Sequence, residues 1–294
     1  IVGSIYNAIT TFVPAADNAH SKFLISLVCG IVMAFLVALI LFGGIKRIGA
    51  VTEKLVPFMS LFYILFTLIV IAAHAGNIGK AFQLIFASAF TPQAVLGAGS
   101  GILLKQTVIW GMRRSAFSNE AGLGSAAIAH AAADTKGPVE QGVFGIFEVF
   151  VDTIVICSLT ALTIICSGVE IPFGVKPGSE LIMQAFATVF GARFASLFVA
   201  FALMLFAFST ILGWSLYGTR CTQFLFGLKA TKIFQGAFIV VVVLGSVASL
   251  DTVWDVADTF NGLMAIPNFI AVFALSGVVA KETRKFFSNP LRRN

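Results

Sequence analysis

Several separate apolar stretches, each about twenty residues long, most strongly constrain how this chain can fold. A helix of about twenty apolar residues crosses the ~30 Å hydrocarbon core of a bilayer. Only 11% of the 294 residues are charged and 59% are hydrophobic, whereas a soluble domain carries about 25% charged residues. Because backbone polar groups in hydrocarbon must be satisfied within the chain, such stretches are expected to be helices. The sequence predicts an all-α polytopic membrane protein.

Hydropathy along the chain predicts seven membrane spans. A long segment at 76–97 contains an apolar stretch, residues 81–90, that is too short to cross and is expected to lie along the membrane or over the bundle. A segment at 168–192 contains Pro172 and Pro177, with a short helix expected after Ser179. The seven spans run over residues 22–43, 55–74, 98–132, 143–167, 193–216, 233–250 and 255–279.

Lysine and arginine are unevenly distributed between the predicted loops. With the loop at 44–54 on the cytoplasmic side, alternation places the basic residues of 133–142, 217–232 and 281–294 on that side too. Cytoplasmic loops of membrane proteins carry an excess of lysine and arginine. We therefore expect a cytoplasmic C-terminus, and we interpret the net charge of +6 as an orientation signal facing anionic lipid, with no nucleic-acid partner.

The third predicted span, 98–132, is too long for one ordinary crossing, since about 35 residues would measure ~52 Å as one helix. Its middle, residues 111–126, reads G-M-R-R-S-A-F-S-N-E-A-G-L-G-S-A. Glycine, serine and asparagine stand there in place of residues that favour helix. The simplest account is two half-helices that meet at an unwound stretch near Ser118–Gly122. Backbone groups freed at membrane depth must be satisfied by protein, water or a bound ion.

A break of this kind is typical of substrate sites in secondary transporters. The N-terminus of one half-helix suits a carboxylate, and the carbonyl groups ending the other suit a dehydrated cation. Ser118 and Asn119 offer short oxygen ligands, and Gly122 and Gly124 permit close backbone approach. The alternative is that these glycines only allow helices to pack closely.

Five ionisable residues lie in or near the predicted spans and are functional candidates. Glu120 lies in the break, and Glu148 and Asp152 lie four residues apart, on one helix face. Two like charges there are costly, so one is expected to be protonated, paired with a cation or near water. Arg113 and Arg114 precede the break as partners or gate charges. The alternative is a structural ion-pair network without substrate contact.

The fifth predicted span places two hydroxyl side chains beside an aromatic ring. Ser209 and Thr210 are adjacent, and Trp214 follows Thr210 by one helical turn. Neutral oxygen ligands beside an aromatic wall suit a small monovalent cation next to a small apolar side chain. The alternative is that both hydroxyls bond to carbonyl groups of the preceding turn.

Two other classes of function compete with transport. An intramembrane enzyme would use Ser118 or Ser125 as nucleophile, His130 as base, and Asp134 or Asp152 to orient it. A passive channel would need a continuous polar lining, which the other spans do not offer. No Walker loop, dinucleotide fingerprint or metal-ligand spacing is present in the sequence, so no resident cofactor is expected.

Six sequence motifs together resemble the alanine/glycine:cation symporter family. That resemblance implies a leucine-transporter-type bundle of two inverted repeats with discontinuous helices, in the bacterial cytoplasmic membrane. It also implies symport of L-alanine or glycine with sodium, or in some members protons, and no enzymatic activity. The motifs are R-R-S-A-F-S-N-E-A-G-L-G-S-A from Arg113, G-G-I-K-R-I at 43–48, E-K-L-V-P at 53–57, V-D-T-I-V-I-C at 151–157, A-F-S-T-I-L-G-W at 207–214 and N-G-L-M-A-I-P-N at 261–268.

The same resemblance implies roles for particular residues. The stretch Phe117–Gly122, including Ser118 and Asn119, would line the substrate, and Trp214 would wall its pocket. The resemblance makes Ser209 and Thr210 the sodium ligands. Asp152 or Thr153 would lie near the ions.

The resemblance also divides the chain into three parts. Residues 1–97 would end the first repeat, with two spans and an extracellular segment, and residues 98–280 would form the second inverted repeat. Residues 281–294 would be a basic cytoplasmic tail. Nothing before residue 98 resembles the first discontinuous helix, so we expect a C-terminal fragment that cannot transport on its own.

Overall fold

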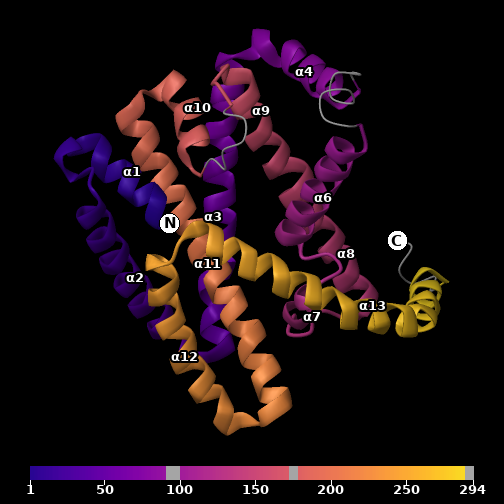
Figure 1. The fold of residues 1–294 in the computed structure, drawn as a ribbon. Helices are drawn as coiled ribbons and strands as arrows, with labels where there is room; N and C mark the ends of the chain where they lie inside the picture. The colour runs from indigo at the N-terminus through magenta and orange to yellow at the C-terminus, as the bar shows by residue number, and fades with distance from the viewer. Residues whose placement is uncertain (91–99, 172–177, 289–294) are drawn as a thin grey trace. The chain divides into compact units, whose positions relative to one another are not determined.

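The computed structural model describes residues 1–90, 100–171 and 178–288, and within these ranges all regular secondary structure is helical. The helices, in chain order, are α1 (Val2–Phe12), η1 (Pro14–Ala16), α2 (Ala19–Leu41), α3 (Gly44–Ala73), η2 (Ala75–Asn77), α4 (Ile78–Phe90), α6 (Ser100–Asn119), α7 (Ser125–His130), α8 (Pro138–Val149), η3 (Phe150–Ile156), α9 (Cys157–Ser167), α10 (Glu180–Phe190), α11 (Ala192–Phe226), α12 (Leu228–Val247) and α13 (Leu250–Ser288) (Figure 1).

Six of the described helical segments are long and apolar enough to cross a membrane. Five are single helices, and the sixth joins α8, η3 and α9 into one continuous run, Pro138–Ser167. Each corresponds to one of the predicted spans, so the all-helical, multi-pass prediction is confirmed. The other five are α2, α3, α11, α12 and α13.

The predicted span at 98–132 is not among the six, so the expected number of seven is not reached in the described residues. Its residues form α6 and the short α7, and residues 98–99 lie outside the described ranges. The physical reason is charge, because Lys105, Arg113 and Arg114 all lie within α6.

The segments predicted not to cross also take definite form. The apolar stretch before residue 91 is α4, and the short helix expected after Ser179 is α10. Residues 281–288 of the predicted tail continue α13. Pro172, Pro177, Arg292 and Arg293 lie outside the described residues.

The chain divides into two compact units, of which the first comprises Ile1–Thr91 and Ile156–Ser249. In this unit α11 packs against α1, α3, α10 and α12, and α2 packs along α12. Its largest core is aromatic, with Phe186 fully buried beside Phe198 at a ring distance of 4.7 Å. Phe66 packs on Phe198 at 4.6 Å. Close stacking of this kind gives the unit a densely packed interior.

A second core in the same unit lies at the other end of α11. Val37 and Leu41 of α2 meet Ile48 of α3 and Leu212 of α11 there. Nearer the N-terminal end of α2, Gly30 faces Ser246 of α12. The two lie so close that a Cβ at Gly30 would overlap the Ser246 side chain. Small residues at such contacts let membrane helices approach each other closely.

The second unit comprises Pro92–Val155 and Leu250–Asn294. Its described helices are α6, α7, α8, α13 and most of η3, and α13 packs against α8. It contains the interruption between α6 and α7 and most of the ionisable residues predicted to matter. The candidate site is built on it.

Candidate functional site

Helical order stops after Asn119 and resumes at Ser125. Glu120, Gly122 and Gly124 have φ angles of 55°, 87° and 82°. Left-handed conformations cannot continue a right-handed helix, and glycine adopts them without the cost that a Cβ imposes. Glu120 is the one non-glycine residue with positive φ in the described parts of the chain. Helical order is therefore interrupted over residues 120–124, which overlaps the predicted stretch Ser118–Gly122 and extends two residues beyond it.

Two side chains at the ends of the break form local hydrogen bonds within it. Asn119 accepts a hydrogen bond at Oδ1 from the backbone N–H of Ala121, at 2.9 Å. Ser125, which is almost fully buried, donates from Oγ to Glu120 Oε2 at 2.7 Å. Glu120 is therefore held inside the turn that it helps to form. Its contact is local, as expected of a side chain that stabilises the break.

The end of α6 meets η3 through a cluster of four polar side chains. Ser118 Oγ donates to Asp152 Oδ2 at 2.6 Å, and Thr153 Oγ1 donates to the same oxygen at 3.2 Å. Asn119 Nδ2 donates to Thr153 Oγ1 at 3.3 Å. The structure thus brings together two residues predicted to bind substrate and two predicted to lie near the ions. We refer to Ser118, Asn119, Asp152 and Thr153 as the break cluster.

The carboxylate of the break cluster comes from a π-helical segment. Phe150–Ile156 forms η3, between the α-helices α8 and α9. A π-helical turn shifts hydrogen bonding to i→i+5, and such turns occur frequently at functional sites. Asp152 and Thr153 are both half-buried in this turn. Hydropathy periodicity gives no signal for it, so the sequence pattern did not predict it.

Glu148 and Asp152, which were predicted to share one helix face, each have a partner of their own. Glu148 Oε2 lies 3.5 Å from His130 Nε2, while Asp152 belongs to the break cluster. The other ring nitrogen, Nδ1, lies 2.6 Å from Gln141 Nε2. The two imidazole nitrogens thus face an amide and a carboxylate. Neither of these two partners is the serine that the enzyme hypothesis requires.

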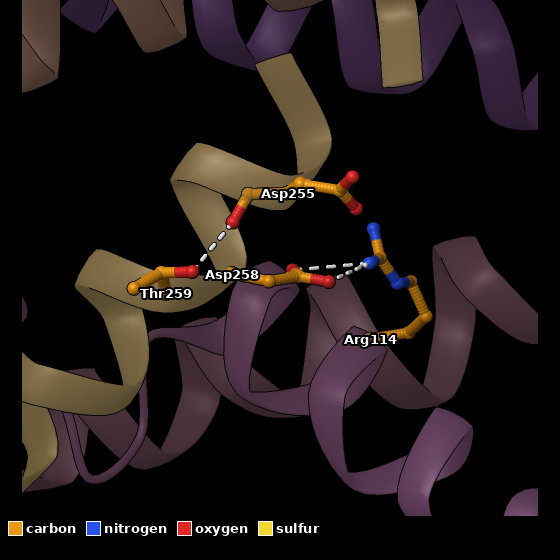
Figure 2. A network of polar contacts seen from close by, with 4 residues as sticks. All are labelled: Arg114, Asp255, Asp258 and Thr259. Carbon is orange, nitrogen blue, oxygen red and sulfur yellow. Dashed lines mark hydrogen bonds and ion pairs between the residues drawn. The ribbon is translucent and has the colours of Figure 1, made fainter. Parts of the chain in front are cut away.

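Arg114 forms an ion pair that the sequence did not identify. Its Nη2 donates to both carboxylate oxygens of Asp258 on α13, at 3.0 and 2.8 Å. Figure 2 shows Asp255 directing its carboxylate toward the same guanidinium, while the Asp255 carbonyl oxygen accepts from Thr259 Oγ1 at 2.7 Å. Asp258 lies inside the predicted span 255–279, so its position as an ionisable residue within an apolar segment could have identified it.

An aromatic platform supports this ion pair. The Arg114 guanidinium carbon lies 4.3 Å from the ring centroid of Trp254, within cation–π range. The Trp254 ring also contacts Phe117, with centroids 5.0 Å apart. Arg113, by contrast, lies 5.9 Å from the Trp110 ring, and no carboxylate of the described residues lies within 4.0 Å of it. The two predicted gate arginines therefore differ in their contacts.

The last residue of the 261–268 motif, Asn268, and the next residue, Phe269, lie against the glycines of the break. A Cβ at Gly124 would come within 2.9 Å of Asn268 Oδ1, whereas a Cβ at Gly122 would lie 3.8 Å from Phe269. Gly124 is therefore required both by its backbone conformation and by the space that Asn268 occupies. This favours close packing as one role of Gly124, beside any role in substrate approach.

The three predicted residues of α11 belong to the first unit. Ser209 Oγ and Thr210 Oγ1 both donate to the Phe206 carbonyl oxygen, at 2.8 and 2.9 Å. Trp214 packs against Tyr217 at a centroid distance of 5.6 Å. The hydroxyl groups thus bond to the preceding turn, as the alternative interpretation expected. Each hydroxyl oxygen keeps acceptor capacity for a cation while donating.

Comparison with known proteins finds relatives that are named as symporters or carrier proteins. Sodium/alanine symporter AgcS of Methanococcus maripaludis is 43% identical over 282 residues, which cover 95% of this chain and 60% of that protein. Amino-acid carrier protein AlsT of Bacillus subtilis is 36% identical, covering 97% of this chain and 60% of that protein. The sodium/proton-dependent alanine carrier protein of Bacillus sp. PS3 is 32% identical, with 88% and 61% covered. The chain thus spans about three fifths of the length of these relatives.

The profile of one protein family matches almost the whole chain. Residues 1–293 match the family described as the sodium:alanine symporter family. The family and the relatives named above are transporters and not enzymes, and the resemblance drawn from the six motifs is confirmed. The chain belongs to the sodium:alanine symporter family.

Proposed function

We propose that this chain forms part of a secondary transporter that moves a small neutral amino acid, alanine or glycine, together with sodium by alternating access. The observation that carries the proposal is the break cluster, in which a carboxylate, two hydroxyl groups and an amide meet at a helix interruption. Short oxygen ligands at an interrupted helix are what a dehydrated ion and an amino-acid substrate need.

The proposed substrate contacts lie along the end of α6 and the break. Phe117 supplies an apolar wall, Ser118 and Asn119 supply polar groups, and Gly122 lets the substrate approach the backbone. Trp214 of the first unit is proposed as a second wall. Aromatic walls with a few polar groups would suit a short side chain such as that of alanine or glycine.

The proposed ion contacts form two groups. Asp152 brings a negative charge and Thr153 a hydroxyl oxygen, so this pair suits a cation or a proton. Ser209 and Thr210 offer two neutral oxygens, which suit sodium as the coupling ion. A proton alternative is favoured at Asp152 because a carboxylate can take up a proton, and a relative is named a sodium/proton-dependent carrier.

The proposed architecture is the leucine-transporter type, with α6 and α7 as the two halves of a discontinuous helix that opens the second repeat. Residues 98–280 would form that repeat, 1–97 the end of the first, and 281–294 a cytoplasmic tail. The excess of basic residues at the start of α3, the end of α11 and the start of α12 supports this orientation. Arg113, Arg114, Glu120 and Glu148 are proposed as gate or structural charges.

The test is uptake of labelled L-alanine into vesicles, with and without an inward sodium gradient. The vesicles contain a full-length transporter that includes this chain. We expect sodium-dependent uptake that falls strongly for Asn119→Leu and Thr210→Val. Uptake that follows a proton gradient and ignores sodium would overturn the ion assignment. Absence of uptake for alanine and glycine, in folded protein, would overturn the substrate assignment.

A further inference from the structure

The first unit contains a half-open cavity, remote in sequence from the break cluster, that neither the substrate nor the coupling ion explains. Its volume is about 130 Å³, and it lies among the ends of α2, α3, α11 and α12. Most of the lining is aliphatic, and Arg220 supplies the only charge on it. The lining residues are Leu41, Gly44, Ile45, Ile48, Leu216, Thr219, Arg220 and Gln235.

Arg220 has no anionic partner in the described parts of the chain. Its Nη1 donates to Gln223 Oε1 at 3.0 Å, and no carboxylate of the described residues lies within 4.0 Å of it. It lies about one and a half turns before α11 ends at Phe226, on a segment apolar enough to cross a membrane. A guanidinium near the hydrocarbon edge is stabilised by an anion, and phosphate matches its planar donors.

The surroundings of the cavity are strongly basic. Lys46 and Arg47 stand at the start of α3, and Lys229 and Lys232 stand at the start of α12. All four are exposed. In the stretches 41–54 and 216–235, which hold all of these residues, Glu53 is the only acidic one. The first turns of α3 and α12 therefore carry positive charge close to the apolar cavity.

We propose that this cavity binds an anionic phospholipid of the cytoplasmic leaflet, with the headgroup phosphate on Arg220 and the start of an acyl chain on the aliphatic lining. Basic pockets between membrane helices on the cytoplasmic side bind anionic headgroups. The aliphatic lining argues for a lipid over free phosphate, because only a lipid fills the apolar part. The excess of positive charge argues for an anionic over a zwitterionic headgroup.

The experiment is native mass spectrometry of the purified chain in detergent, titrated with phosphatidylglycerol or with phosphatidylcholine of the same acyl chains. We expect preferential retention of phosphatidylglycerol and a roughly fivefold weaker affinity for Arg220→Gln, as expected for one basic residue near an anionic headgroup. Arg193→Gln is the matched control, because Arg193 lies on the same helix about 40 Å away. It should leave the affinity unchanged.

A second variant tests the apolar part of the cavity. Thr219→Phe fills space among the lining residues and keeps Arg220, so it should also weaken phosphatidylglycerol binding. Equal retention of the two lipids, equal loss in both arginine variants, or full displacement by inorganic phosphate would overturn the proposal. Because the readout is lipid retention, these outcomes do not depend on whether the protein transports alanine.

Discussion

Replacing Asp258 with asparagine removes the charge that faces Arg114 while keeping the shape of the side chain. The carboxylate accepts two hydrogen bonds from Arg114 Nη2, at 3.0 and 2.8 Å. Its side chain is 19% exposed and that of Arg114 is 37% exposed. The pair is therefore partly shielded from water, and its removal is expected to matter more than the loss of a surface ion pair.

The size of the expected loss of stability depends on the Arg114 charge, which Asp258→Asn leaves without its carboxylate partner. Hydrogen bonds to charged groups contribute about 1.5–3 kcal/mol, and breaking a fully buried pair costs about 3–5 kcal/mol. Arg114 Nε is already buried without a hydrogen-bond partner in the described residues. Partial exposure brings the expected loss for Asp258→Asn to about 1–3 kcal/mol, with the neighbouring Asp255 carboxylate offsetting some of it.

The assay is thermal unfolding of the detergent-purified protein, analysed as a double-mutant cycle with Arg114→Gln. We expect the double variant to be less destabilised than the sum of the single variants, because removing both partners leaves no unpaired charge. Arg113→Gln is the matched control, since Arg113 has no carboxylate of the described residues within 4.0 Å. Strict additivity, or a loss for Arg113→Gln equal to that for Arg114→Gln, would refute the reasoning.

Three further predictions concern the break and the first unit. Gly124→Ala should destabilise the protein by about 1–2 kcal/mol from its positive φ alone and further through its contact with Asn268. Gly122→Ala should lose only the stability that the positive φ costs, because a Cβ at Gly122 meets no close contact. Equal melting temperatures for the two variants would contradict the packing argument. Asp152→Asn should lower the affinity for the coupling cation at least tenfold while leaving the protein folded, measured as the cation dependence of uptake; an unchanged dependence would remove Asp152 from the ion site. Desolvation raises the pKa of Glu180, but hydrogen bonds from Asn7 and from backbone N–H groups outweigh it, so the pKa is lowered overall. This contact therefore stabilises the fold above the ordinary carboxyl pKa and is lost as pH falls through the lowered value; Glu180→Gln should unfold with a weaker acid dependence than the wild type, and identical acid profiles would contradict this.

Hydropathy located the membrane-crossing parts of the chain but not the ends of the helices. The segment 44–54 was predicted as a loop, yet α3 begins at Gly44 and includes Lys46 and Arg47. Likewise α11 continues to Phe226 and α12 begins at Leu228, so the predicted loop at 217–232 is reduced to a turn at Gly227. Apolar runs report where a helix meets lipid, whereas backbone hydrogen bonding continues into polar residues of good helix propensity.

The candidate site was partly predictable for a related reason. Local composition predicted an interruption near Ser118, because glycine and asparagine there disfavour helix and tolerate left-handed backbone. The contact of Ser118 with Asp152 joins residues 34 positions apart, and no periodicity encodes such a distance. The bond between Arg114 and Asp258 joins residues even farther apart. Pairings of this kind depend on tertiary packing, which a single sequence does not report.

The break cluster offers a physical route for coupling an ion to a substrate. Ser118 and Thr153 direct their hydroxyl hydrogens to Asp152. A sodium ion beside this carboxylate would reverse those dipoles, because the hydroxyl groups would then turn their lone pairs to the cation. Ser118 is also a proposed substrate contact, so the ion and the amino acid would depend on the same side chain. Such a shared group makes the two binding free energies interdependent and reciprocal. On this proposal Ser118→Ala should weaken cation and alanine binding and abolish the dependence of each on the other. A variant that weakened both and kept full mutual dependence would place the coupling elsewhere.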